Sequence, residues 1–296
     1  MTSTRRRVCI EHEPQMLPDL EPQAGCFYHC PDVTNAALLS PEVSQIHWKC
    51  CGHSGFQDRS QERRVICYLA GNAAPITRDD VVGIVEMLHN VPRNTSVDFL
   101  LHTGGGDIDA AEKIVNLLRT AVGTGRLRVI VPDFAKSAGT LIALAADKIV
   151  MSDSSELGPI DPQFLKKDGD GNARWLSVLS YLKAYENPCE RLRTAPDDVP
   201  ARIMISKLDP TTVVQFEAIS KRARTLAEEH LSRWMFQQKK ANYTKIAGDL
   251  MNTNLWPAHG QMISWEDAKQ MELEVQYFSQ RARNGAITGV SSAFSG

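Results

Sequence analysis

The sequence lacks any long hydrophobic run. No apolar stretch is longer than residues 141–146, whereas a membrane-spanning helix needs about 20 consecutive apolar residues. The basic N-terminal sequence MTSTRRRVCIEHEP is not followed by an apolar segment, so no secretory signal is expected. These two absences predict a protein with no transmembrane segment.

The sequence also lacks a large excess of positive or negative charge, and it lacks a disulfide framework. The 33 Lys and Arg residues nearly balance the 35 Asp and Glu residues, which leaves a net charge of −2 and no general attraction to nucleic acid. The seven cysteines are odd in number, and the chain is too long to depend on a disulfide scaffold. A reducing, cytoplasmic location fits this cysteine usage.

Common cofactor motifs are missing as well. The run GGGDID lacks the later glycine of a dinucleotide-binding fingerprint, and no Gly-Lys-Ser/Thr of a Walker motif follows it. Cysteines and histidines gather near the N-terminus, but their spacing matches no standard zinc pattern. We therefore expect neither a cofactor nor a bound metal. The loosely spaced group comprises Cys26, His29, Cys30, His47, Cys50, Cys51 and His53.

From residue 61 onward, β-branched apolar runs alternate with helical periodicity. Such alternation predicts an α/β fold with a parallel sheet core and right-handed crossovers. Residues 1–60, rich in Pro, Cys and His, predict an irregular arm or small subdomain, and residues 281–296 a flexible tail. The predicted strands are 64–71, 96–103, 126–135 and 147–153, and the predicted helices are 78–91, capped by Thr77, and 107–122, 137–146, 176–192 and 211–240.

Two features of the predicted sheet carry chemistry. Ser137 follows one strand and opens a helix of small residues, which places a hydroxyl at the carboxyl edge of the sheet and at the positive end of a helix dipole. Gly104, Gly105 and Gly106 follow the preceding strand, and glycines can turn their N–H groups outward to hold an oxyanion. Taken alone, Ser137 is more typical of a helix N-cap, and only the glycine turn beside it favours the chemical role.

The segments LLHTGGGDIDAAEKI, FAKSAGTLIALAADKIVM and ELGPIDPQ resemble the serine dehydrogenase proteinase family. That family groups with signal peptide peptidase A-like serine peptidases in the Clp-protease/crotonase fold. The resemblance extends over residues 64–275 and implies a spiral of β-β-α units that forms a homo-oligomer. It also implies a peptidase domain over residues 61–280. By this resemblance, Ser137 is the nucleophile, and the N–H of Ala138 and the turn at Gly105 and Gly106 form the oxyanion hole.

The group that activates the serine is less evident. The segment 157–164 has no histidine where Clp-type peptidases carry one, whereas peptidase A-like enzymes use a lysine on a later helix. Lys183 lies 46 residues after Ser137 among apolar neighbours and is the predicted general base, since burial can lower a lysine's pKa toward neutrality. The rivals are Lys166 and Lys167. His102 and Asp161 are interpreted as a structural histidine and a turn residue.

The predicted function is therefore that of a serine peptidase with a Ser-Lys dyad, which cleaves peptides or unfolded proteins through an acyl-enzyme. Two alternatives remain open. A crotonase-like enzyme would use the same oxyanion hole on a CoA thioester but would need Glu or Asp bases. A catalytically inactive scaffold would bind partners through its N-terminal arm and its long charged helix.

Overall fold

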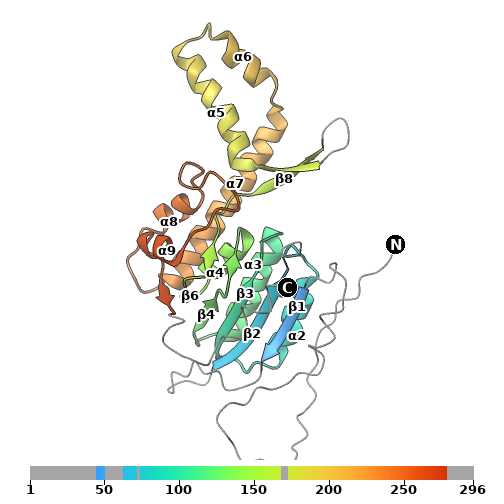
Figure 1. The fold of residues 1–296 in the computed structure, drawn as a ribbon, viewed down its shortest axis with the longest axis vertical. Coiled ribbons are helices and arrows are strands. Elements are labelled where there is room, and N and C mark those ends of the chain that lie inside the picture. Colours follow the sequence, from blue (N-terminus) through green and yellow to red (C-terminus); the bar gives the residue numbers. More distant parts are fainter. Residues whose placement is uncertain (1–44, 51–62, 72–73, 168–172, 279–296) are drawn as a thin grey trace, which may run out of the picture.

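The computed structural model describes residues 45–50, 63–71, 74–167 and 173–278. A six-stranded sheet lies at the centre of the fold (Figure 1), and its order is β1-β2-β3-β4-β6-β10. The strands from β2 to β10 pair in parallel, and β1 joins one edge antiparallel to β2. The predicted parallel core is thus confirmed. The strands are β1 (Gln45–Cys50), β2 (Arg63–Ala70), β3 (Ser96–His102), β4 (Leu127–Ile130), β6 (Lys148–Met151) and β10 (Val275–Tyr277).

Three helices connect the central strands: α2 (Asp80–His89), α3 (Ile108–Val122) and α4 (Ala138–Leu144). The side chain of Asp107 caps α3 by accepting hydrogen bonds from the N–H groups of Asp109 and Ala110. Every residue of α4 is buried, which its run of small and aliphatic side chains permits. Helix α3 packs against both α2 and α4. The short α4 is therefore held inside the core.

A small second layer crosses the carboxyl edge of the main sheet. It contains β5 (Phe134–Ala135) paired in parallel with β7 (Glu156–Leu157). Isolated bridges extend this layer from Ala135 to Thr103 and from Leu157 to Ile263. The prediction of one continuous strand over 126–135 was wrong, because the chain leaves the main sheet after β4 and Pro132 has no N–H to continue the ladder.

A helical arm projects from this body (Figure 1). It is built from α5 (Val178–Thr194), α6 (Val199–Ser206) and the N-terminal part of α7 (Pro210–His230). A hairpin of β8 (Gln163–Lys167) and β9 (Ala173–Ser177) extends from its base. A separate small core of Val178, Leu182, Val213 and Phe216 holds the base together. The predicted helix at 176 begins two residues later, because the side chain of Ser177 caps α5.

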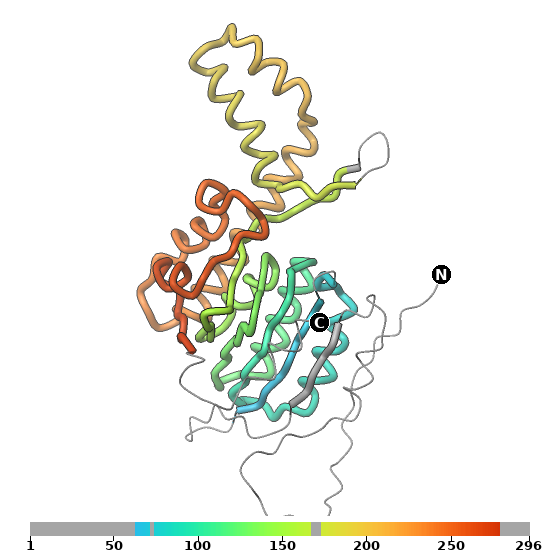
Figure 2. The backbone as a smooth tube through the Cα atoms, viewed as in Figure 1, coloured from blue at the N-terminus to red at the C-terminus, as the bar shows by residue number. Residues whose placement is uncertain are grey.

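The remaining elements return the chain to the sheet. The predicted helix over 211–240 is shorter in the structure, because α7 ends at His230. A single π-helical turn, η1 (Leu231–Met235), follows it directly. Helices α8 (Tyr243–Leu250) and α9 (Trp265–Gln270) follow, and β10 then pairs with β6 although they lie far apart in the sequence (Figure 2). Among the described residues, no helix combines the length and apolar character needed to cross a bilayer.

Candidate active site

Ser137 lies at a sharp turn between β5 and α4. Its backbone has φ 52° and ψ −113°, a conformation that costs a non-glycine residue about 1–3 kcal/mol. Its side chain does not cap α4 and makes no hydrogen bond to any residue that the structure describes. The nucleophiles of many hydrolases occupy a similar strained turn from strand to helix, which exposes the hydroxyl. The half-buried Ser137 is therefore held in a strained turn of this kind.

The glycine turn lies directly against this serine. A Cβ added to Gly105 would come 2.9 Å from the Cβ of Ser137, and one added to Gly106 would come 2.3 Å from the backbone N of Ile76. Both residues also have positive φ angles, 101° and 149°. Side chains are excluded here by space and by conformation, so only glycine allows the turn to approach Ser137 so closely.

Some backbone N–H groups near Ser137 already donate a hydrogen bond within the protein, and others do not. The N–H of Gly105 donates to the hydroxyl of Thr103 at 3.1 Å. The N–H groups of Gly106 and Ala138 donate to no acceptor within the described part of the chain. The structure thus brings Gly105, Ser137 and Ala138 to one place, and Gly106 follows Gly105 in the same turn. It leaves Gly106 and Ala138 as the candidate donors to an oxyanion.

Close packing keeps α4 in position below this turn. A Cβ added to Gly139 would lie 2.6 Å from the Cγ2 of Thr103, so a larger residue would push α4 away from the end of β3. The N–H of Gly139 also donates to the carbonyl of Lys136 at 2.7 Å, which closes the turn around Ser137. Gly139 therefore has a structural role in the turn that holds Ser137.

Lys183, the predicted base, lies on α5 near the base of the arm. Its ammonium donates to the Oδ1 of Asn254 at 2.8 Å, and no hydrogen bond joins it to Ser137 in the described structure. The rival Lys166 is exposed on β8. The structure does not bring either lysine into contact with the serine hydroxyl.

A buried carboxylate and a histidine, which the sequence did not pair, meet beyond β7. The Oδ1 of Asp161 accepts a hydrogen bond from the Ser177 hydroxyl at 2.7 Å, and its Oδ2 lies 3.7 Å from the Nδ1 of His259. The position of Asp161 before Pro162 suggested an ordinary turn, but its side chain is buried. His259 opens the segment HGQMIS, and no spacing in the sequence indicates that it returns to Asp161.

Lys136, adjacent to Ser137, directs its side chain to the segments that carry this pair. Its ammonium lies 2.8 Å from the Oε2 of Glu156 and donates to the carbonyls of Leu157, Gly260 and Gln261 at 3.3–3.4 Å. The donors of Lys136 are thus engaged on the side of β7. The segment after His259 is fastened to the residue that precedes Ser137.

His102 has a different environment, inside the core. Its ring is 3% exposed and packs on Phe134 with the ring centroids 4.0 Å apart, and its Nδ1 lies 3.9 Å from the Oδ2 of Asp133. Burial lowers the pKa of His102, and the Asp133 carboxylate opposes this effect. These contacts support its interpretation as a structural histidine.

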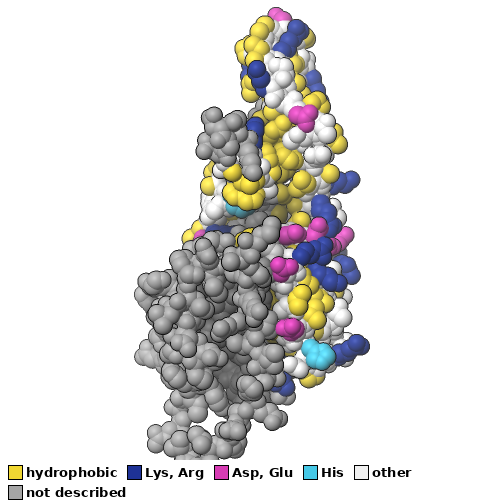
Figure 3. All heavy atoms as spheres, turned by 90° about the vertical axis from the view of Figure 1, so that its right-hand side faces the viewer, with side chains coloured by type: hydrophobic (Ala, Val, Ile, Leu, Met, Phe, Trp, Pro, Cys, Tyr) yellow, Lys and Arg dark blue, Asp and Glu magenta, His cyan; other side chains and the backbone are white. Residues whose placement is uncertain are grey.

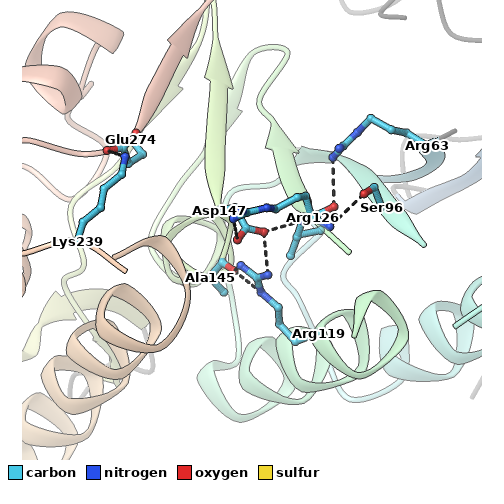
Figure 4. A network of polar contacts seen from close by, with 9 residues as sticks. Arg63, Ser96, Arg119, Arg126, Ala145, Asp147, Lys239 and Glu274 are labelled. Carbon is cyan, nitrogen blue, oxygen red and sulfur yellow. Dashed lines mark hydrogen bonds and ion pairs between the residues drawn. The ribbon is translucent and has the colours of Figure 1, made fainter. Parts of the chain in front are cut away.

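Polar side chains from two other helices hold the carbonyl groups of α4 and of the residue after it. Arg119 of α3 donates to the carbonyl of Ala145 and pairs with Asp147 at 2.9 Å (Figure 4). On the other side, the Nδ1 of His230 on α7 lies 2.9 Å from the carbonyl of Leu141. Because a cation and a donor satisfy carbonyls that the short helix leaves unpaired, α4 is fixed at the end opposite Ser137.

The His230 contact predicts a dependence of stability on pH. Burial lowers the pKa of His230 to about 4, so the unfolded chain takes up this proton at a higher pH than the folded protein does. Stability is therefore full above pH 6.5 and falls as the pH drops toward 4. The difference in pKa corresponds to about 3 kcal/mol.

Urea unfolding measured between pH 4 and pH 7.5 tests this prediction. The His230→Gln variant should lose most of this pH dependence, although it is expected to be less stable at pH 7. The exposed His89 provides a control, and His89→Gln should retain the wild-type slope. An equal slope in the wild type and in His230→Gln would contradict the prediction.

No metal site is evident in the residues described. Within these ranges, no group of three or more His, Cys, Asp or Glu side chains could hold an ion. His47 and Cys50 of the loosely spaced N-terminal group lie on β1. The other members, Cys26, His29, Cys30, Cys51 and His53, lie outside the described residues.

Comparison with curated proteins gives two partial matches, both from Methanocaldococcus jannaschii. The uncharacterized protein MJ0137 is 44% identical over 88 residues, and the uncharacterized protein MJ1495 is 39% identical over 88 residues. Each match covers 30% of this chain and 30% of the relative. The chain therefore matches less than a third of the length of either relative.

Solved structures with low sequence identity were also found. A mutant of the 1510-N membrane-bound stomatin-specific protease is 16% identical, with a TM-score of 0.42, and the match covers 69% of this chain and 75% of that chain. ClpP1 from Listeria monocytogenes is 13% identical, with a TM-score of 0.38 and coverage of 70% and 89%.

A family model gives a much longer match. The model of the ClpP-like SDH-type serine proteinases matches residues 73–276, more than two thirds of the 296-residue chain. This segment includes the glycine turn, the strained serine and the Asp161–His259 pair. The chain belongs to the family of ClpP-like SDH-type serine proteinases.

Proposed function

We propose that this protein is a serine peptidase that hydrolyses peptide bonds through an acyl-enzyme, with Ser137 as the nucleophile. The observation that carries this proposal is the strained, half-buried Ser137 beside a glycine turn. Membership in a serine proteinase family supports the same reaction. Peptides or unfolded proteins are the proposed substrates, and neither a cofactor nor a metal is required.

The proposed reaction has two steps. In the first, the Ser137 oxygen attacks the peptide carbonyl while a base takes the hydroxyl proton, and the N–H groups of Gly106 and Ala138 stabilise the oxyanion. The base then gives this proton to the departing amine, which leaves an ester on Ser137. In the second step, water attacks the ester, again with the help of the base, and restores the free hydroxyl.

Two groups are candidates for the base. Lys183 is the candidate predicted from the sequence, and its ammonium is held by the amide oxygen of Asn254. His259 is the second, because an imidazole is the usual activator of a serine. The Asp161 carboxylate lies near it, with Oδ2 3.7 Å from the Nδ1 of His259. The link from Lys136 to the carbonyls after His259 supports this second candidate, since it ties the histidine segment to the residue before Ser137.

The two alternative functions make different predictions for a covalent probe. A crotonase-like enzyme would turn over CoA thioesters, but its serine would not react with the probe. An inactive scaffold would show neither thioester turnover nor labelling. The direct test is incubation with a fluorophosphonate, followed by mass spectrometry of the peptide that contains Ser137. Labelling at Ser137 supports the peptidase, whereas thioester turnover without labelling supports the crotonase-like alternative.

We also propose that the protein forms a homo-oligomer through its arm. Apolar side chains gather along the arm (Figure 3), and those most exposed are Val199, Ile203 and Met204 on α6 and Val214 and Ile219 on α7. Large exposed apolar surfaces are typical of sites of association. A cytoplasmic location remains a prediction from the cysteine content.

Sedimentation of charged variants tests the role of the arm. Ile203 is 55% exposed, so Ile203→Glu should leave the fold intact but place a charge in the interface and shift the protein to smaller species. Val82 on α2 is 61% exposed and provides the control, because Val82→Glu should sediment as the wild type does. The proposal fails if Ile203→Glu and the wild type have the same mass.

A further inference from the structure

Gly158 lies in the segment that leads from β7 to Asp161, and it is packed between two residues that flank Ser137. A Cβ added to Gly158 would lie 2.5 Å from the Cδ of Lys136 and 3.2 Å from its Cα. On its polar side, Gly158 meets the hydroxyl of Thr140. The segment is thus in contact with the residue before the nucleophile and with the first turn of α4 after it.

Thr140 forms the polar half of this contact. Its side chain is fully buried, and its hydroxyl lies 2.8 Å from the carbonyl oxygens of both Ala135 and Gly158. The same hydroxyl accepts a hydrogen bond from the N–H of Gly158 at 3.2 Å. One side chain on the nucleophile helix therefore joins β5 to the segment that carries Asp161.

Lys136 forms the charged half. Its ammonium pairs with Glu156 and donates to the carbonyl of Leu157, just before Gly158. It also donates to the carbonyls of Gly260 and Gln261, just after His259. The two segments that carry Asp161 and His259 are thus both fastened to residues within three positions of Ser137.

We propose that Thr140 and Lys136 are positioning residues that hold the segments of Asp161 and His259 in register with Ser137. This inference rests on the proposed peptidase function. Neither side chain needs to touch substrate. Each fixes the distance between the nucleophile turn and the segments opposite it, and displacement of a reacting group by about 1 Å can cost a factor of about 100 in rate.

The test compares variants that differ at the Thr140 hydroxyl. Thr140→Val keeps the shape of the side chain but removes the hydroxyl, and it should reduce the limiting rate of fluorophosphonate labelling by about 10- to 100-fold. Thr140→Ser keeps the hydroxyl and should stay within about 3-fold of the wild type. The probe concentration at half-maximal rate should change little, because a residue that only positions others does not bind the probe.

A matched control separates positioning from general stability. Ser96 is a buried hydroxyl at the opposite edge of the sheet, where it accepts a hydrogen bond from the N–H of Arg126 (Figure 4). Ser96→Ala should lower thermal stability without changing the labelling rate. If Thr140→Val does not fold, Lys136→Met serves as the second variant, with the same expected loss of rate.

Hydrogen exchange provides a readout that does not depend on activity. The N–H of Gly158 should exchange at least about 10-fold faster in Thr140→Val than in the wild type, because it loses its acceptor. Labelling of Thr140→Val at the wild-type rate would overturn the inference, and so would an equal loss in Thr140→Ser. If the wild type is not labelled at all, the peptidase proposal fails, and unchanged exchange at Gly158 then overturns the positioning role separately.

Discussion

Replacement of Ser137 by alanine should abolish fluorophosphonate labelling and reduce peptide hydrolysis by at least about 10⁴-fold. The reason is chemical: alanine has no oxygen to form the acyl ester, while the N–H groups of Gly106 and Ala138 remain in place. These amides allow only the small residual rate that oxyanion stabilisation and binding provide. The measurement is hydrolysis of a fluorogenic peptide together with mass spectrometry of the labelled protein.

The fold of the Ser137→Ala variant should be intact, because the Ser137 hydroxyl makes no hydrogen bond within the described residues. Ser154 is exposed on the turn before β7, so Ser154→Ala is the matched control and should keep full activity. Ser137→Gly should be more stable than Ser137→Ala by about 1 kcal/mol, because glycine adopts the positive φ without strain. Full hydrolysis by the alanine variant would remove Ser137 from the mechanism.

Replacement of the general base should have the second largest effect. If His259 is the base, His259→Gln should reduce the acylation rate by about 10²- to 10⁴-fold, while Lys183→Met stays close to the wild type. The measurement is the rate of fluorophosphonate labelling at Ser137 in the wild type and in each variant.

Lys183 gives the opposite pattern if it is the base. Lys183→Met would then be silent, and His259→Gln would stay close to the wild type. His89→Gln, on the exposed face of α2, controls for a general effect of histidine loss. Full activity in both His259→Gln and Lys183→Met would exclude the two candidates together and would require another base.

Local sequence was sufficient for the elements around the site. The apolar periodicity after Asp107 predicted α3, and the small residues after Ser137 predicted α4. The three glycines predicted a tight turn. These features depend on neighbours in the chain, so they can be recognised without the fold. The hairpin of β8 and β9 was missed because its charged residues, including Lys166, resemble a polar loop.

The pairing of distant groups was not accessible in the same way. Asp161 and His259 are separated by nearly a hundred residues, and their contact depends on the bridge from Leu157 to Ile263. The direction of Lys136 away from Ser137 likewise depends on Glu156 across the second layer. Neither relation leaves a periodic signal in the sequence.

By itself, the sequence determined the alternation of strands and helices, the glycine turn and the serine that follows β5, because each is set by backbone preferences over a few residues. Only the tertiary structure decided which groups surround Ser137. Closure of the second layer brings the segment after His259 to Lys136 and places the hydroxyl of Thr140 on Gly158. The physical reason is that these contacts form between segments joined only by the folded sheet, so no short stretch of chain encodes them.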